Sequence, residues 1–431
     1  MIVYLSLIIV LLFVVYNKRK LFVLSPVDIF IVYYLAVVVF TTLYHFYYPR
    51  SEKINFFNLD IKNHKNFTEQ LCVFLRVITL FLSGVFLYKF INPTYNAINR
   101  KPIEVVNLKD RKINYKVLSD VTTVLLLICV LLVYLDYGDQ LFVRKKYIPK
   151  DSSVLKMIYS NLMIFISVLA GILMNKFKTV SRIAIFTTVF IGICLGSRIA
   201  SICLILFGIT YSLFLATRKE KIVFLCFFVP FMTIFFGYNI SLRSESFGHG
   251  LIPYMEVTFK RPEIIFEYTV RNIYYTFIFG FYVTSETIKL YKDASIDKLM
   301  TCMNPLPGGM VNWYQIYKQL RINIFAPFSA IGELAKFPIF SFFYYIFLGY
   351  YFSVIDNFIK KSIVNRKYVF AIIQVLMLLL FVMFSYEYNL RSTHRFIWYS
   401  VFVLIISFYF YKIKKIKFVF KETKNDESIT Q

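Results

Sequence analysis

The stretch that decides the fold is IVFLCFFVPFMTIFFGYNI at residues 222–240, and SLRSESFGHG follows it at once at residues 241–250. The first stretch has no charged residue, and a helix of about 20 such residues crosses the hydrocarbon core of a bilayer. The second stretch brings charges, glycines and a histidine, and polar sequence continues to Lys336. Because loops between spans are usually short, an insert as long as 241–336 is expected to hold a site.

The composition supports a membrane protein. Of the 431 residues, 58% are hydrophobic and 20% are aromatic, which is too apolar for one soluble core with a polar surface. The formal net charge is +25, but the basic residues lie in short stretches between apolar runs. That pattern is typical of membrane topology and of contact with anionic lipid headgroups, so no nucleic-acid partner is expected.

Apolar segments that are long enough, or nearly long enough, to cross a bilayer recur along the chain. The sequence therefore predicts an all-α polytopic protein with about 11 transmembrane helices and one large extracytoplasmic insert between helices 8 and 9. The predicted divisions are 1–240 for helices 1–8, 241–336 for the insert, 337–411 for helices 9–11, and 412–431 for a tail. The predicted spans are 2–16, 27–48, 71–91, 117–137, 154–174, 180–196, 199–216, 222–240, 337–355, 368–385 and 396–411.

The distribution of Lys and Arg predicts the orientation of these spans. With the amino terminus outside, the inner connections and the tail hold 25 Lys and Arg, and the short outer loops hold 12. Positive loops stay on the cytoplasmic side, so the tail is predicted to be cytoplasmic and the insert to face outward. In a bacterial inner membrane the insert then lies in the periplasm, which lacks nucleotides, and any substrate has to arrive already activated.

Arginines are the candidate anion ligands on the predicted outer side. Arg198 follows Gly196 and Ser197 in a turn between two spans, where a cation is costly unless it reaches water or has an anionic partner. One interpretation is an Arg that snorkels to the interface, and the other is a site for a lipid diphosphate, which guanidinium groups bind through paired hydrogen bonds. The other candidates, each of which has a solvated charge or a salt bridge as its alternative, are Arg271, Arg391, Arg243 and Arg395.

The candidate general bases are two histidines and the glutamates Glu333 and Glu245. His249 lies in Phe247-Gly-His-Gly250, His394 lies in Arg391-Ser-Thr-His-Arg395, and Glu333 ends Ser329-Ala-Ile-Gly-Glu333. Histidine titrates near neutral pH and can act as a base, although a single loop histidine more often has no such role. No metal-ligand spacing or phosphate-binding glycine loop is present in the sequence, so neither a metal nor a cofactor is expected.

The insert also has a turn with aromatic residues behind it. Asn304-Pro-Leu-Pro-Gly-Gly309 is predicted to be a rigid turn, since proline fixes φ and glycine lets the backbone approach a ligand. Trp313, Tyr314 and Tyr317 follow, and such rings either stack on sugar faces or form an interfacial aromatic belt.

Together these features resemble the O-antigen (oligosaccharide repeat unit) polymerases of the Wzy-dependent pathway. The resemblance covers the architecture, including the final outer loop with its arginines, and it is specific only at Gly196–Arg198, Asn304–Gly309 and Ser329–Glu333. It implies a metal-independent glycosyltransferase that moves a growing glycan from undecaprenyl diphosphate to a hydroxyl of the incoming lipid-linked repeat unit. On this reading Arg198, Arg271 and Arg391 hold the diphosphate, and Glu333 or His249 accepts the proton of the hydroxyl.

Other functions stay open at this stage. An O-antigen ligase shares the topology and the insert, and a flippase for the lipid-linked unit also binds an anionic lipid. A membrane acyltransferase and a non-catalytic scaffold or receptor are further alternatives. The expected partners are the undecaprenyl-diphosphate-linked oligosaccharide and the lipid bilayer, whereas a chain-length regulator protein is an open possibility.

Overall fold

The computed structural model describes residues 1–16, 25–47, 67–92, 114–145, 154–197, 199–215, 218–245, 248–311, 313–323, 326–364 and 368–427. Over these ranges the chain is helical, and two isolated β-bridges are the only extended pairing. The prediction of an all-α fold is confirmed. Within the same ranges six helices are long and apolar enough to cross a membrane, as expected of a polytopic membrane protein; the number of eleven spans stays a prediction.

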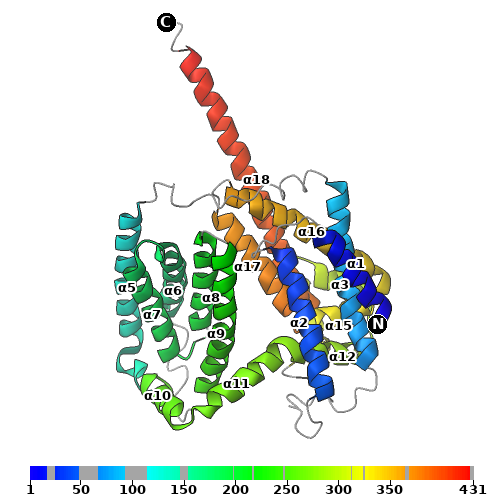
Figure 1. The fold of residues 1–431 in the computed structure, drawn as a ribbon, viewed down its shortest axis with the longest axis horizontal. Coiled ribbons are helices and arrows are strands. Elements are labelled where there is room, and N and C mark those ends of the chain that lie inside the picture. Colours follow the sequence, from blue (N-terminus) through cyan, green and yellow to red (C-terminus); the bar gives the residue numbers. More distant parts are fainter. Residues whose placement is uncertain are drawn as a thin grey trace. The chain divides into compact units, whose positions relative to one another are not determined.

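The chain divides into two compact units. Unit 1 comprises residues 1–103 and 276–431, and unit 2 comprises residues 104–275. The division passes through the predicted insert, and the predicted domain bounds and membrane side of that insert stay predictions. Figure 1 shows the helices of each unit.

The helices of unit 1 are α1 (Ile2–Tyr16), α2 (Pro26–Tyr47), α3 (Phe67–Ile91), α12 (Gly280–Leu290), α13 (Ile296–Met303), η4 (Gly308–Val311), α14 (Trp313–Gln319), α15 (Ala330–Ala335), α16 (Pro338–Val364), α17 (Tyr368–Phe384) and α18 (Leu390–Glu427). Those of unit 2 are α5 (Tyr115–Tyr137), η2 (Gly138–Leu141), α6 (Val154–Leu173), α7 (Lys178–Cys194), α8 (Ile199–Phe214), α9 (Arg218–Glu245), α10 (Leu251–Lys260) and α11 (Glu263–Ile273). A π-helical segment, η3 (Tyr274–Phe279), links α11 to α12.

The close packing of α3 on α16 forms the centre of unit 1. A Cβ added at Gly84 would lie 1.9 Å from the carbonyl oxygen of Ile346, and one added at Gly349 would lie 2.0 Å from that of Phe81. Small residues at such positions let two helix backbones meet, which is how helices associate where lipid removes the hydrophobic driving force. Beside this contact the Phe30 ring stacks on Phe81, with ring centroids 3.8 Å apart.

Unit 2 packs α5, α7 and α8 around α6. Its core contains Tyr159, Met163 and Ile166 of α6, all fully buried. The turn between α7 and α8 is closed by two bonds: Gly196 N–H donates to Ile193 O over 2.7 Å, and Ser197 N–H donates to Gly192 O over 2.9 Å. Gly196 has a φ of 60°, so this is a Schellman helix end.

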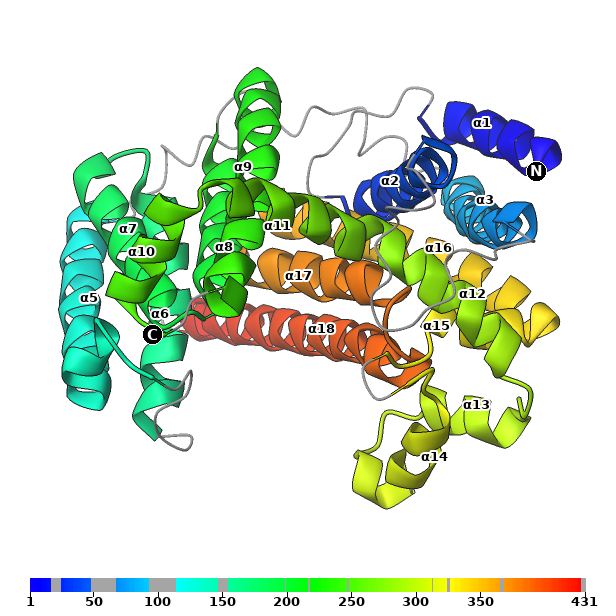
Figure 2. The same cartoon turned by 90° about the horizontal axis from the view of Figure 1, so that it is seen from below.

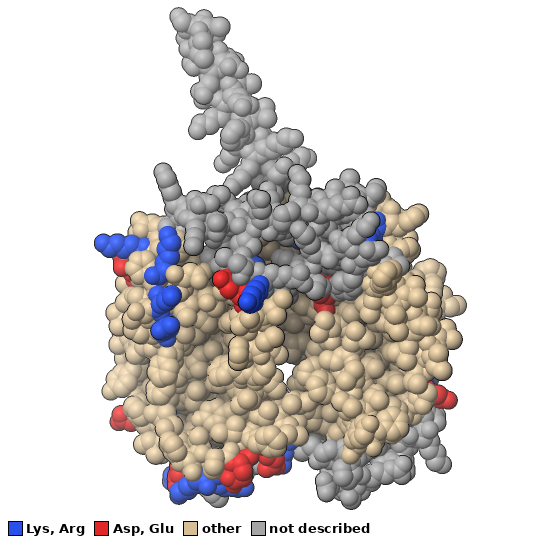
Figure 3. All heavy atoms as spheres, in the orientation of Figure 1, with Lys and Arg blue, Asp and Glu red and all other residues tan. Residues whose placement is uncertain are grey.

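Hydroxyl groups inside the helices are satisfied locally. Ser167 Oγ donates to Met163 O over 2.7 Å, and Thr210 Oγ1 donates to Leu206 O over 2.6 Å. Such bonds to the preceding turn allow a polar side chain to be buried without a partner on another helix. On the face drawn in Figure 3, the charged side chains of the described residues gather toward the ends of the helices and leave a broad band between them.

A helix lies at each of the eleven predicted spans, and several of these helices extend past the predicted span ends, α16 and α18 the furthest. Helix α16 continues nine residues past the predicted end at residue 355, to Val364, and carries a buried ion pair there. Helix α18 begins at Leu390 and not at residue 396, because Asn389 Oδ1 accepts the N–H of Ser392 and caps it. The predicted outer loop therefore includes the first turns of α18, and residues 412–427 of the predicted tail are helical.

Candidate functional site

The candidate site lies in unit 1, around the short helix α15 that carries Glu333. Ser329 caps this helix, because its Oγ accepts the N–H of Gly332 over 3.0 Å. The same Oγ lies 2.9 Å from Thr284 Oγ1, and Ser329 N–H donates to Thr287 Oγ1 over 3.0 Å, so α12 holds the start of α15. A Cβ at Gly332 would lie 2.5 Å from Thr287 Cβ. The Ser329–Glu333 motif thus places one carboxyl group at a fixed position.

Glu333 is 2% exposed, and its carboxyl group has no cationic partner among the described residues. Its Oε1 accepts the N–H of Leu390, 3.3 Å away, and its Oε2 accepts the Cys302 thiol, 3.7 Å away. Burial raises the pKa of Glu333 from 4.5 to about 8, and the two hydrogen bonds only partly oppose that rise. Burial also raises the pKa of Cys302, with a further contribution from Glu333, so the thiol stays protonated.

Arg391, the second residue of α18, is 1% exposed and binds the backbone of the predicted turn. Its Nη1 donates to Thr301 O over 2.6 Å and to Asn304 O over 3.1 Å, and its Nη2 donates to Leu306 O. The guanidinium carbon lies 5.2 Å from the centre of the Trp313 ring. Arg391 therefore holds the Asn304–Gly309 segment in place, and Asn304 Oδ1 closes the turn by accepting Leu306 N–H over 2.9 Å.

Glu333 and Arg391 are both buried but do not form an ion pair with each other. Cys302 lies between them, in contact with Glu333 and close enough to Arg391 for that charge to act on its thiol. Burial and then the like charge of Arg395 lower the pKa of Arg391. The Arg391 Nε–H has no partner among the described residues, and Arg395 is half-buried, with neither a hydrogen bond nor an ion pair to any of them. Two cations one helical turn apart without an anion are unfavourable, so this end of α18 is suited to an anionic ligand.

His394 lies on the same part of α18 and is also buried. Its Nδ1 is 3.1 Å from the Tyr344 hydroxyl group, and its ring meets Trp398 edge to face. Burial lowers the pKa of His394 from 6.5 to about 4, so the imidazole is neutral at physiological pH. A neutral imidazole has a nitrogen that can accept a proton.

The three aromatic residues predicted to bind sugar occupy different surroundings. Trp313 is 9% exposed because Arg391 covers its ring, whereas Tyr314 is 70% exposed. Tyr317 is half-buried, and the Arg321 guanidinium carbon lies 4.7 Å from the centre of its ring. Only Tyr314 and part of Tyr317 are accessible to a ligand in this arrangement.

The remaining predicted site residues do not belong to unit 1. His249 lies in unit 2, pairs its backbone with Arg144 and has its Nδ1 3.1 Å from the Tyr254 hydroxyl group. Arg271 takes the salt-bridge alternative, since it pairs with Glu267 four residues earlier, and it also stacks on Tyr268, 4.7 Å from the ring centre. Arg243 lies in α9, and only its backbone is described. Arg198 lies outside the described residues.

Sequence reasoning missed two charged residues in this part of the chain, one half-buried and one buried. Glu387 is half-buried beside Tyr386, and burial raises its pKa to about 8, with the Tyr386 hydroxyl group opposing the rise. Arg144 is 5% exposed and donates from Nη1 to Cys194 O over 2.9 Å, beside the Gly196 turn. No local signal separates either residue from an ordinary loop charge.

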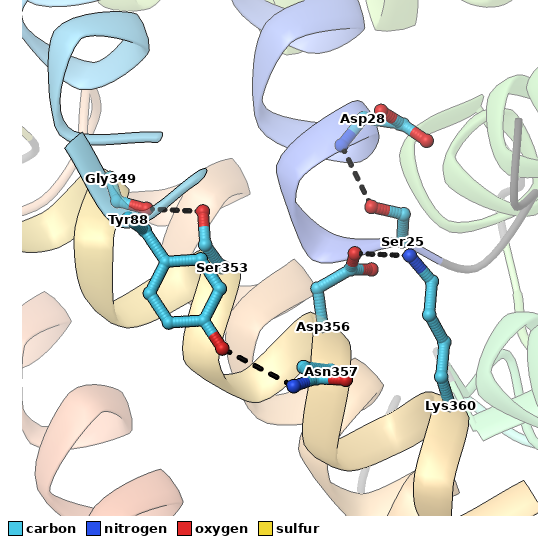
Figure 4. Close-up of polar contacts among 8 residues, drawn as sticks. All are labelled: Ser25, Asp28, Tyr88, Gly349, Ser353, Asp356, Asn357 and Lys360. Atoms are coloured by element: carbon cyan, nitrogen blue, oxygen red, sulfur yellow. Dashed lines mark hydrogen bonds and ion pairs between the residues drawn. The ribbon is translucent and has the colours of Figure 1, made fainter. Parts of the chain in front are cut away.

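A second buried polar cluster lies in the last turns of α16 (Figure 4). Lys360 Nζ is 2.7 Å from Asp356 Oδ2, and the two side chains are 3% and 0% exposed. Asn357 Nδ2 donates to the Tyr88 hydroxyl group over 3.3 Å, and Ser353 Oγ donates to Gly349 O over 2.9 Å. The first turn of α2, which packs against α16, brings Ser25 and Asp28 into the same view.

The described residues contain no group of three or more His, Cys, Asp or Glu side chains that could hold a metal ion. Comparison of the chain with protein-family models, curated proteins and solved structures gives no match. Functional inference therefore rests on the site itself.

Proposed function

We propose that the protein is a membrane glycosyltransferase that polymerises oligosaccharide repeat units carried on undecaprenyl diphosphate, with its site on the outer face of a bacterial inner membrane. The observation that carries this proposal is a pair of buried ionisable groups with no ion pair between them, the Glu333 carboxyl group and the Arg391 guanidinium group, with Arg395 one turn further along α18. Two of the specific motifs, Asn304–Gly309 and Ser329–Glu333, contribute residues to this one cluster together with the final outer loop. The loop charges favour an outward orientation, and because nucleotides are absent on that side, the donor has to arrive already activated.

The reaction fits groups of this kind. The oxygen of an acceptor hydroxyl attacks the anomeric carbon of the growing glycan, a new glycosidic bond forms, and the bond between that carbon and the phosphate oxygen breaks. Undecaprenyl diphosphate leaves with the electron pair and one additional negative charge. Cations fixed near the leaving oxygen stabilise that charge as it develops.

Arg391 and Arg395 have different roles in this proposal. Three of the four Nη–H groups of Arg391 donate to carbonyl oxygens, so Arg391 positions the Asn304–Gly309 turn and has only its Nε–H and one Nη2–H left for a ligand. Arg395 keeps its whole guanidinium group for the diphosphate, which it can bind through two parallel hydrogen bonds.

The proton of the acceptor hydroxyl goes to a base within the same cluster. His394 is neutral and Glu333 is largely protonated at pH 7, as their shifted pKa values require. A carboxyl group with a pKa near the working pH is well suited to proton transfer, and we assign this role to Glu333. His249, the other base that the resemblance implies, belongs to unit 2 and is not part of this cluster.

The test is the gel profile of the surface glycan in the native host. Disrupting the gene should leave single repeat units capped on the lipid A core, without a ladder of longer chains. Restoring the wild-type gene should restore the ladder, and Arg395→Ala should shorten or abolish it at an unchanged protein level. Lys289→Ala is the matched control, because Lys289 is an exposed cation of the same unit.

Two outcomes count against the proposal. Loss of all repeat units from the lipid A core on disruption would indicate a ligase or a flippase. A normal ladder from Arg395→Ala would show that the proposed diphosphate site is wrong. The flippase alternative gains nothing from the ion pair in α16, because Asp356 and Lys360 neutralise each other and offer no net charge to an anionic lipid.

A further inference from the structure

The segment that covers Arg391 has an unusual outer surface. We call residues 296–311 and 313–319, which comprise α13, the Asn304–Gly309 turn, η4 and α14, the α13–α14 cap. Its most exposed apolar and aromatic residues are Ile296 (70%), Met300 (60%), Leu306 (49%), Met310 (73%) and Tyr314 (70%). A periplasmic segment surrounded by water would carry polar residues at such positions.

Helix α13 carries apolar residues on two of its faces. It therefore does not have one apolar face toward the protein core and one polar face toward water. Leu299 and Cys302 face the interior and are 4% and 2% exposed. Ile296 and Met300, four residues apart and so on one face of the helix, point outward. The inner face packs on unit 1, and the outer face needs a second apolar environment.

The cap is continuous with the apolar surface of α18. Trp398 of α18 donates its Nε1–H to Met303 O, at the end of α13, over 3.0 Å. From Trp398, which is 39% exposed, the outward side of α18 continues through Phe402 and Ile405, at 62% and 59%. These two residues lie in a predicted span, where the surroundings are lipid. Figure 2 shows α13 and α14 beside the first turns of α18, projecting away from the other helices of unit 1.

The charges next to these residues are mostly positive. Between residues 289 and 321 the chain has five basic side chains and two acidic ones, namely Lys289, Lys292, Lys298, Lys318, Arg321, Asp293 and Asp297. Basic groups beside apolar ones are typical of segments that lie in the interface of an anionic membrane. An aqueous protein partner would not explain the continuity with a lipid-facing helix.

We propose that the α13–α14 cap lies in the membrane–water interface of the outer leaflet, with Met300, Met310 and Tyr314 in contact with lipid. The cap thereby holds the turn and the Arg391 guanidinium group at the level of the lipid headgroups. The proposal needs the membrane but does not depend on the proposed function. It also assigns Tyr314 to the aromatic belt, the alternative to sugar binding.

The experiment is photocrosslinking in proteoliposomes. The photoreactive residue p-benzoylphenylalanine replaces Met310 or Tyr314 in the full-length protein, reconstituted in phosphatidylethanolamine and phosphatidylglycerol. Asp293, an exposed polar residue just before the cap, is the control position. After irradiation, mass spectrometry of the peptides that cover residues 293–319 should find lipid adducts at Met310 and Tyr314 at about ten times the Asp293 level, given the preference of such side chains for apolar surroundings.

The other outcomes overturn the proposal. Crosslinks between two copies of the chain would show that the cap is a protein interface, and lipid adducts no more frequent than at Asp293 would place it in water. Because all three positions are on the surface, a failure to fold does not explain either outcome. A cap found in water would leave the proposed polymerase activity untouched, since the gel profile reports on that activity separately.

Discussion

The two buried polar clusters of unit 1 use charge in opposite ways. Asp356 and Lys360 lie four residues apart on α16 and neutralise each other. Glu333 and Arg391 come from separate segments and contact N–H, thiol and carbonyl groups, with no ion pair between them. Glu333 lies just before the start of α16, and Asp356 lies 18 residues after that start, which is about 27 Å along a helix. A charge in an ion pair is already neutralised, whereas a buried ionisable group outside an ion pair is available for a ligand or for holding distant backbone in place.

The largest effect is expected from breaking the pair in α16. Asp356→Leu leaves the Lys360 ammonium group buried without its carboxylate, which should lower the free energy of unfolding by about 3–5 kcal/mol. Asp356→Leu with Lys360→Met removes both charges and should restore most of that stability. Thermal unfolding in detergent measures the difference.

The double variant also tests the comparison directly. If the pair only supports the fold, the double variant should give a normal polymer ladder. A double variant that is stable but makes no polymer would show that the charges in α16 take part in function.

Arg391 should give the next largest effect. Arg391→Ala leaves three carbonyl oxygens without a donor, and each hydrogen bond from a charged group contributes about 1.5–3 kcal/mol. Arg391→Lys keeps the charge but loses the planar fork, so it should rescue only part of the loss. Hydrogen exchange of residues 301–311 should rise strongly in the Ala variant and moderately in the Lys variant.

Lys289→Ala again serves as the control and should leave the exchange of residues 301–311 unchanged. Protection equal to wild type in Arg391→Ala would mean that the turn is held by other contacts. The positioning role of Arg391 would then be wrong.

The sequence predicted what depends on neighbouring residues. Helical segments follow from runs of apolar residues, and the Glu267–Arg271 salt bridge follows from the spacing of four. The spacing of Asp356 and Lys360 is just as visible. It was overlooked because hydropathy placed the end of the span at residue 355, before the pair.

Contacts between distant residues could not be predicted in this way. Arg391 meets Thr301, Asn304 and Leu306 across 85 to 90 residues, and Glu333 meets Leu390 across 57. Composition marked the Asn304–Gly309 and Ser329–Glu333 segments as special without showing that both lie against the start of α18. The sequence also suggested that the two glycines of this turn let the backbone approach a ligand. Gly308 instead lies against the Trp313 side chain, where an added Cβ would be 3.3 Å away.

Glu333 should give a pH-dependent effect. Its folded-state pKa of about 8 lies above the ordinary 4.5, so its contribution to stability is complete below about pH 4.5 and is lost as pH rises through 8. Glu333→Gln has no proton to lose. The unfolding temperature of the wild type should therefore fall relative to Glu333→Gln between pH 5 and 9.

The rate of polymerisation should show the opposite trend if Glu333 is the base. The deprotonated fraction grows about tenfold per pH unit below the pKa, so wild-type activity should rise toward pH 8, and Glu333→Gln should lose both the activity and the slope. An unchanged pH profile in Glu333→Gln would assign the base to another group.

The smallest expected effect comes from one chemical change made in each cluster. Tyr88→Phe removes the hydroxyl group that accepts from Asn357, and Tyr344→Phe removes the one beside His394. A single uncharged hydrogen bond contributes about 0.5–1.5 kcal/mol, so both variants should unfold at slightly lower temperatures and by similar amounts. Only Tyr344→Phe should also shorten the polymer, because it frees a ring nitrogen one turn from Arg391. Equal ladders from the two variants would mean that His394 and Tyr344 support the fold in the same way as Asn357 and Tyr88, and the functional cluster would then shrink to Glu333, Arg391 and Arg395.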